Sequence, residues 1–149
     1  MTSTRRSPSR YDNDGVARHP TLILLSRLDD AARLPDEPLI CTITLAELSV
    51  GPLVATTPEE RAARQVHLQQ AEADFEPLAF DAAAARAFGS VAASLRQHGR
   101  KPAARAFDAL IAAVATAHGL PVYTCNPGDF RGIADLTVHD VPHPDRAAD

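Results

Sequence analysis

The sequence predicts an α/β domain with a mostly parallel sheet that carries helices on both of its faces. Short apolar runs rich in β-branched residues alternate with helical segments, and this order is typical of parallel sheets. The most apolar helical segment, residues 107–117, leads through a short turn into Val122–Cys125, which has the composition of a buried strand. A chain of 149 residues, 45% of them hydrophobic, is long enough for one domain with a single core.

The amino-terminal segment, residues 1–20, is rich in Ser, Arg, Asp and Pro, so we expect it to be disordered or atypical. The domain itself is then expected to cover residues 21–149. Thr21–Leu25 is compatible with a strand or a helix by periodicity alone. Because the apolar pattern continues to Leu34, we predict a helix that Pro35 ends.

Short apolar runs predict the remaining strands. Leu39–Ile43 is expected to form a buried strand, and Thr44–Leu48 begins the helix that follows it. Phe75–Phe80 is a weaker strand candidate because Pro77 interrupts it. Residues 136–141 are expected to form a last strand, at the edge of the sheet.

Local capping signals mark the helices in the second half of the chain. Thr57, followed by Pro58 and Glu60, predicts an N-terminal cap with a capping box. Asp81 is expected to cap the alanine-rich helix that follows it. Gly119 is expected to end the apolar helix as a C-terminal cap.

Composition excludes several classes of protein. A formal charge of −4 argues against broad electrostatic adhesion to nucleic acid, so any RNA contact is expected to be focused. No apolar run approaches the roughly 20 residues that a membrane span needs. The start of the chain does not have the pattern of a secretory signal, and two cysteines give little sign of an oxidising compartment. We therefore expect a cytoplasmic protein with no membrane contact.

Three acidic residues occupy comparable places, near the ends of strands and the starts of helices. Glu47 lies at a strand-to-helix junction, Asp108 in the first turns of the apolar helix, and Asp129 just after a strand. Together they could hold a hard cation, because Mg²⁺ and Mn²⁺ take carboxylate oxygens as ligands. Such a site supports attack of metal-activated water on a phosphodiester.

Each of the three carboxylates also has a structural alternative. Glu47 could complete a capping box by bonding to the backbone N–H of Thr44. Asp108 could pair with Arg105 or cap a helix that starts late. Asp129 could stabilise the Pro-Gly turn beside it, which is a common role of Asp.

Two blocks of the sequence resemble the PIN-domain ribonucleases, and among them the VapC toxins of bacterial toxin–antitoxin pairs. The first block is Ile43–Leu48 with Gly51, which resembles the strand–helix block that carries the second acidic residue of the family. The second block combines Phe107–Ala113 with Gly119–Pro121 and Thr124–Phe130, and it resembles the part that carries the third and fourth. The resemblance covers roughly residues 21–141.

The resemblance implies a three-layer α/β/α PIN-like domain with a mostly parallel sheet and an acidic pocket for Mg²⁺ or Mn²⁺. Glu47, Asp108 and Asp129 would be both the metal ligands and the catalytic residues of a Mg-dependent endoribonuclease toxin. RNA would be the substrate, a cognate antitoxin protein the partner, and a homodimer the assembly. Apolar residues of segment 48–68 are expected to form an exposed groove for the antitoxin: Leu53, Val54, Val66 and Leu68.

One part of the family's pattern is not evident. The family opens with a hydrophobic strand that ends in Asp, the first acidic ligand, whereas Val16–Pro20 supplies neither strand nor Asp. Asp12 and Asp14 lie several residues too early. We therefore expect weak or absent ribonuclease activity. The alternative function is a catalytically inactive PIN-fold protein that binds an antitoxin or dimerises; a nucleotide-binding module ranks last because no glycine-rich phosphate loop is present.

Overall fold

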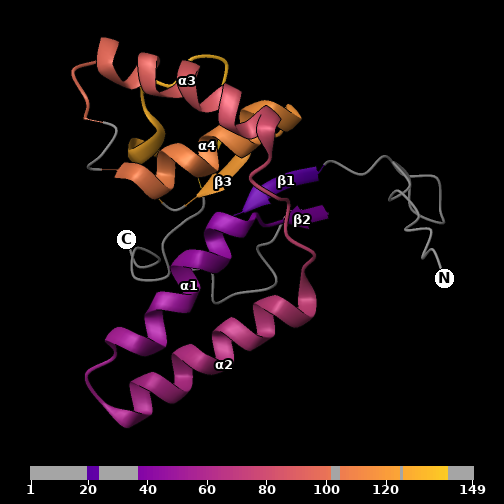
Figure 1. Cartoon of the computed structure of the whole chain (residues 1–149), viewed down its shortest axis with the longest axis vertical. Helices are drawn as coiled ribbons and strands as arrows, with labels where there is room; N and C mark the ends of the chain where they lie inside the picture. The colour runs from indigo at the N-terminus through magenta and orange to yellow at the C-terminus, as the bar shows by residue number, and fades with distance from the viewer. Residues whose placement is uncertain (1–19, 24–36, 102–104, 125, 141–149) are drawn as a thin grey trace, which may run out of the picture.

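Four short parallel strands form the sheet of this protein. Figure 1 shows the arrangement of the chain. The structure is a computed structural model that describes residues 20–23, 37–101, 105–124 and 126–140. The strand order is β2-β1-β3-β4, and the strands have these bounds: β1 Pro20–Ile23, β2 Glu37–Leu39, β3 Val122–Thr124 and β4 Val138–Asp140. The predictions of a parallel sheet and of an edge strand within residues 136–141 are therefore confirmed.

The strand β1 corrects the prediction of a helix from Thr21. Residues 20–23 lie in the middle of the sheet, where Leu22 is in register with Leu39 of β2 and with Val122 of β3. A short apolar run does not distinguish strand from helix, and here pairing on both sides decides it. The sheet therefore has its central strand, contrary to the expectation that it is missing. The rest of the predicted helix, residues 24–34, lies outside the described residues, as do Asp12 and Asp14.

Four α-helices follow the predicted segments, with these bounds: α1 Thr42–Val54, α2 Pro58–Asp74, α3 Ala82–Gln97 and α4 Ala106–His118. The caps are confirmed. The Thr57 hydroxyl accepts a hydrogen bond from the backbone N–H of Glu60, and the Asp81 carboxylate accepts one from Ala84. Gly119 adopts the left-handed conformation, with φ 63°, that ends α4.

The predicted strand Leu39–Ile43 is wrong in its second half. The strand β2 ends at Leu39, and helix α1 already begins at Thr42. Between them the backbone makes a single bridge, in which Cys41 pairs with Leu78. That bridge is all that forms from the weak strand candidate at residues 75–80.

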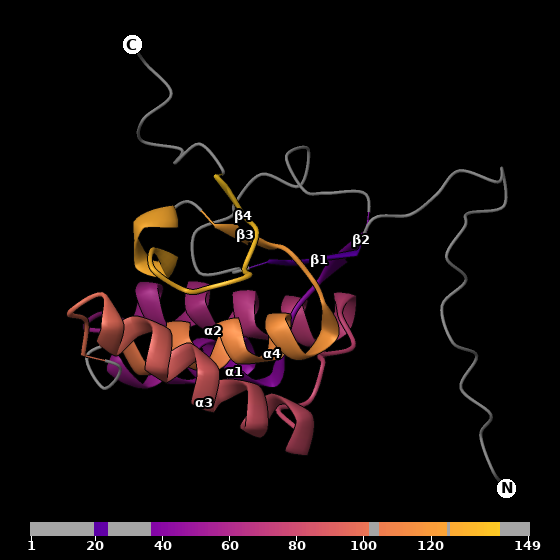
Figure 2. The ribbon, with the colours of Figure 1, turned by 90° about the horizontal axis from the view of Figure 1, so that it is seen from above.

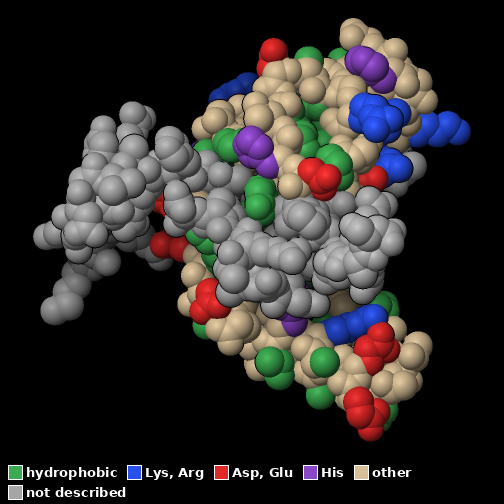
Figure 3. Space-filling view, turned by 180° about the vertical axis from the view of Figure 1, so that it is seen from behind, with side chains coloured by type: hydrophobic (Ala, Val, Ile, Leu, Met, Phe, Trp, Pro, Cys, Tyr) green, Lys and Arg blue, Asp and Glu red, His purple; other side chains and the backbone are tan. Residues whose placement is uncertain are grey.

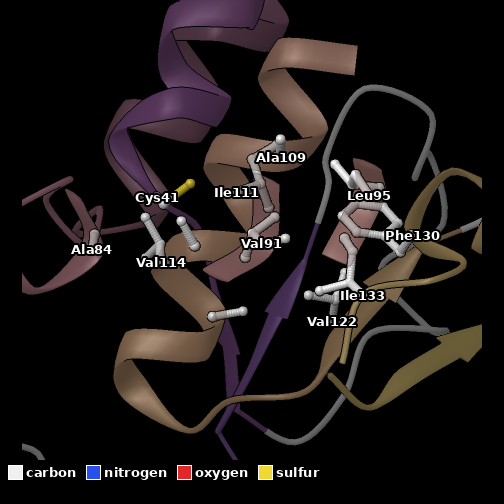
Figure 4. Close-up of a cluster of buried hydrophobic side chains, with 13 residues drawn as sticks. Cys41, Ala84, Val91, Leu95, Ala109, Ile111, Val114, Val122, Phe130 and Ile133 are labelled. Atoms are coloured by element: carbon white, nitrogen blue, oxygen red, sulfur yellow. The ribbon is translucent and has the colours of Figure 1, made fainter. Parts of the chain in front are cut away.

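Helix α4 is the centre of the main core (Figure 4). Every residue from Ile111 to Ala115 is buried, so α4 is covered on nearly all sides, as its apolar composition predicts. Its alanines allow α3 to approach closely, and Val91 and Leu95 of α3 fill the contact. Phe130 and Ile133, which follow β3 in the chain, belong to the same core as Val122 of β3. A rigid α4 therefore fixes the position of its first turn.

All four α-helices lie on the same side of the sheet (Figure 2). A second, smaller apolar cluster joins this helical side to β1, because Ile23 packs with Ile40 and Ala71. The further helical layer of the predicted three-layer arrangement does not fall within the described residues. In the described part of the chain, no helix is both long and apolar enough to cross a membrane.

Candidate active site

Asp129 lies at the carboxyl edge of the sheet, in the short helix η4 (Pro127–Phe130) that follows β3. In the sheet, β1 has β2 on one side and β3 on the other, so the chain continues from β1 in opposite directions. The carboxyl ends of β1 and β3 are therefore the point where the strand order reverses, and ligands of open α/β sheets bind at that point. The predicted placement of Asp129 agrees with this topology.

Asp108 reaches the same edge from a different direction. A short turn at Gly119 joins α4 to β3, so α4 runs roughly antiparallel to the strand and its first turn lies at the carboxyl edge. Asp108 is the third residue of α4, where the positive end of the helix dipole favours a carboxylate. The alternative that Asp108 caps the helix is wrong, because Arg105 is the N-cap residue.

Glu47 lies in the interior of α1, and its capping alternative is wrong as well. The N-cap residue of α1 is Cys41, so Thr44 is not the cap residue that a capping box with Glu47 would need. Instead, Glu47 is half-buried and close to Asp108. Within the described residues, the Glu47 carboxylate has neither a hydrogen-bond partner nor an ion-pair partner. A carboxylate in such a place is costly unless a cation comes to it.

The three carboxylates interact electrostatically: Asp108 acts on Glu47, and Asp129 acts on Asp108. Burial raises the pKa of Glu47 to about 7, and the negative charge of Asp108 adds to this rise. Burial also raises the pKa of Asp108, and Asp129 adds to it, while Arg105 partly offsets the rise. Asp108 therefore interacts electrostatically with both Glu47 and Asp129, and we call these three carboxylates the acidic row.

Two arginines contact the Asp129 end of this row. The Arg105 guanidinium forms an ion pair with the Asp129 carboxylate, so the alternative that pairs it with Asp108 is not the one observed. Arg100 donates instead to backbone carbonyls, at 2.8 Å to Gly128 and 3.5 Å to Asp129. Thr124 also supports this turn, because its hydroxyl accepts a hydrogen bond from the backbone N–H of Asn126. The sequence indicates a basic connection here but not which groups the arginines bind.

The chemistry of the row suits a divalent cation. Within the described residues, no group of three or more His, Cys, Asp or Glu side chains is arranged to hold a metal ion between them. Mg²⁺, however, commonly uses one or two carboxylates and keeps several waters, so a complete cage is not required. The donors are all carboxylate oxygens, and two of them have pKa values raised by burial and by neighbouring negative charge. Such a row favours a hard cation over a soft one.

A cavity of about 230 Å³ lies elsewhere, near the amino ends of β3 and β4. Its lining includes Thr116, Asp135 and His139, and none of the three carboxylates. The buried Thr116 hydroxyl oxygen has no hydrogen-bond partner within the described chain. We assign no chemistry to this cavity, because the carboxylates lie at the opposite edge of the sheet.

Comparison with known proteins gives a consistent result. Residues 15–136 match the family described as the PIN domain. Ribonuclease VapC5 of Mycobacterium tuberculosis is 42% identical over 95 residues, which are 64% of this chain and 68% of the relative. Ribonuclease VapC4 of the same organism is 35% identical over 99 residues, which are 66% of this chain and 73% of the relative.

A solved structure matches the fold over most of its length. It is the crystal structure of VapBC-5 from Mycobacterium tuberculosis, a member of the VapBC family of toxin-antitoxin systems. The match has a TM-score of 0.71 and 34% sequence identity, and it covers 82% of this chain and 98% of the other. The match therefore extends over nearly the whole of the solved chain.

Proposed function

Since this chain belongs to the PIN-domain family, we propose that it is a VapC-type endoribonuclease, the toxin of a toxin–antitoxin pair. The observation that carries the proposal is the row of Glu47, Asp108 and Asp129 at the carboxyl edge of a parallel sheet. The motifs around these residues resemble those that carry the acidic residues of the family. The relatives named as ribonucleases support the reaction class, and RNA is the proposed substrate.

We assign Glu47, Asp108 and Asp129 as the metal-binding and catalytic residues. When Mg²⁺ or Mn²⁺ is bound, it would supply an activated water and stabilise negative charge that develops on a phosphodiester. Asp108 interacts electrostatically with both of the other carboxylates, so it would orient the cation. The raised pKa of Glu47, about 7, favours its protonated form while no cation is present, and a bound cation would favour the ionised carboxylate.

Exposed basic side chains close to Arg100 in the chain would bind the RNA backbone. Arg96 and Lys101 are exposed on either side of Arg100, which anchors the turn that carries Asp129. Because the whole chain carries a formal charge of −4, this local basic rim is where phosphate contact is favoured. The contacts would be few, and RNA binding should weaken with added salt.

The amino-terminal strand sets the expected level of activity. Pro20–Ile23 contains no acidic residue, so β1 itself brings no carboxylate to the edge of the sheet. A cation held by fewer carboxylates binds less tightly, and the attacking water loses a group that positions it. We therefore expect cleavage by the chain to be weak.

The same observation favours a second candidate function, an inactive PIN-fold protein that still binds its partner. To separate the two, purified chain is incubated with a mixed RNA pool and Mn²⁺, with and without EDTA. Asp108→Asn serves as the variant that removes the middle charge. Cleavage that EDTA and Asp108→Asn both abolish supports the nuclease. Cleavage that survives both comes from another enzyme, and no cleavage favours the inactive protein.

The proposed partner is an antitoxin protein, which would bind to the helical hairpin of α1 and α2. Apolar side chains are exposed on this hairpin, visible at the lower end of Figure 3. Leu53 is 80% exposed, Val54 60% and Val66 62%. The prediction that part of this surface is exposed in the monomer is confirmed, and an amphipathic helix is the usual occupant of such a surface. We further propose that the chain acts in the cytoplasm and forms a homodimer.

A further inference from the structure

We propose that Arg105 is a cation built into the active site, which holds Asp129 until a divalent metal ion displaces it. The Arg105 guanidinium forms an ion pair with the Asp129 carboxylate. The same carboxylate is a proposed ligand of the metal, so this inference rests on the metal-dependent function proposed above. Arg105 and the metal ion would compete for the Asp129 carboxylate. This competition would set the metal concentration at which half of the sites are occupied.

The position of Arg105 in the chain supports this competition. Arg105 immediately precedes α4, as its N-cap residue, while Asp129 lies far along the chain in η4. The ion pair therefore joins the start of α4 to the turn after β3, which are the two elements that carry Asp108 and Asp129. The positive charge of Arg105 also acts on Asp108. It is therefore placed to compete with a cation at two carboxylates.

The fold does not need this ion pair to hold the turn. Arg100 already anchors the turn through its hydrogen bond to the Gly128 carbonyl. Phe130, at the end of the turn, is buried in the main core. The turn should therefore keep its shape when Arg105 moves away. The Asp129 side chain then becomes available without any change in the backbone that carries it.

The ion pair is also weak enough to be displaced. The Arg105 side chain is 41% exposed and the Asp129 side chain 33%. Ion pairs exposed to this extent contribute little to stability, because water screens them and both side chains lose freedom. A doubly charged metal ion interacts more strongly with the same carboxylate than a singly charged guanidinium does. Displacement by a metal ion is therefore favourable, and Arg105 lowers the metal affinity without preventing binding.

The test measures binding of Mn²⁺ to the full chain by titration calorimetry, with Mn²⁺ electron paramagnetic resonance as a second readout. Arg105→Gln removes the charge and keeps a polar side chain with hydrogen-bond donors. It should tighten Mn²⁺ binding by about three- to tenfold at low salt, and by less as salt is added. Arg105→Lys keeps the charge and should stay close to the native affinity. Arg64→Gln breaks an ion pair with Glu60 and a hydrogen bond to the Gly51 carbonyl, both away from the three carboxylates, and should leave Mn²⁺ binding unchanged.

The outcomes separate this inference from the proposed function. Tighter binding in Arg105→Gln alone supports the inference. Native binding that is lost in Asp108→Asn but equal or weaker in Arg105→Gln overturns it and leaves the metal site in place. If neither the native chain nor Arg105→Gln binds Mn²⁺, both the metal site and the inference are wrong. Circular dichroism of each variant shows that the fold is retained, which is expected because Arg105 and Arg64 are both partly exposed.

Discussion

Glu47 on α1 and Asp108 on α4 lie within electrostatic reach of each other, although two other helices separate them in the chain. Burial, with the charge of Asp108 as the second cause, raises the pKa of Glu47 to about 7 from its ordinary value of 4.5. Packing of α1 against α4 brings the two carboxylates together. This relationship gives the site a dependence on pH that can be measured without RNA.

Glu47 should make the metal-free chain less stable as pH rises. Its pKa is higher in the folded than in the unfolded chain, so the folded chain binds more protons between these two values. The contribution of Glu47 to the free energy of unfolding is fully present below about pH 4.5. It is lost as the pH rises through about 7. After allowance for solvent screening, the loss should be about 1–2 kcal/mol.

Thermal unfolding in EDTA between pH 5 and pH 8 measures this effect. Glu47→Gln should flatten the pH dependence, whereas Glu72→Gln, on the exposed side of α2, should leave it unchanged. Equal slopes in Glu47→Gln and the native chain would mean that Glu47 ionises normally.

Asp108→Asn should weaken Mn²⁺ binding by about tenfold or more, because it removes a full negative charge with little change of shape. Asp74→Asn is the matched control, since Asp74 lies at the exposed end of α2 and bonds only to Gln70 among the contacts observed. Calorimetry checks both variants. Unchanged affinity in Asp108→Asn would remove Asp108 from the metal site.

Arg100→Gln should loosen the turn that carries Asp129. It removes the hydrogen bond to the Gly128 carbonyl, which is worth about 1 kcal/mol. In a chain of this size, the thermal midpoint should fall by about 2–4 °C. Mn²⁺ binding should weaken too, the opposite of the effect expected for Arg105→Gln. Tighter binding in both variants would mean that the two arginines act only through their charge.

Leu53→Ser should reduce binding of the antitoxin without destabilising the chain. Leu53 is 80% exposed, so its replacement should change the free energy of unfolding by less than about 0.5 kcal/mol. Co-purification with the antitoxin, followed by calorimetry, checks the binding. Arg86→Ser on α3 is also exposed and should bind normally. Normal binding by Leu53→Ser would place the antitoxin on another surface.

Leu22→Pro should test whether residues 20–23 form the central strand. A strand paired on both sides uses every backbone N–H. Proline has no N–H, so at the middle of the strand it leaves a backbone carbonyl of a neighbouring strand unpaired. This should lower the free energy of unfolding by ~1–3 kcal/mol. The first turn of a helix would instead tolerate proline. Leu22→Val, which keeps the N–H group, is the control for urea unfolding. A fully stable Leu22→Pro variant would contradict the strand.

The sequence by itself determined the features that depend on neighbouring residues. The caps at Thr57 and Asp81, and the left-handed end of α4 at Gly119, involve groups only a few residues apart, so the local sequence suffices. The apolar composition of α4 likewise specifies its burial. The motifs around Glu47 and Asp108 also indicated the family without any knowledge of the fold.

Only the tertiary structure decided the features in which distant groups compete. Pro20–Ile23 became a strand because neighbours on both sides offered backbone pairing, which no local pattern reveals. Helix α1 begins at Thr42, earlier than the predicted Thr44, so Glu47 has no capping role. Arg105 paired with Asp129 rather than Asp108 because η4 brings that carboxylate to the start of α4. In each case two arrangements are locally similar in energy, and long-range contacts select one of them.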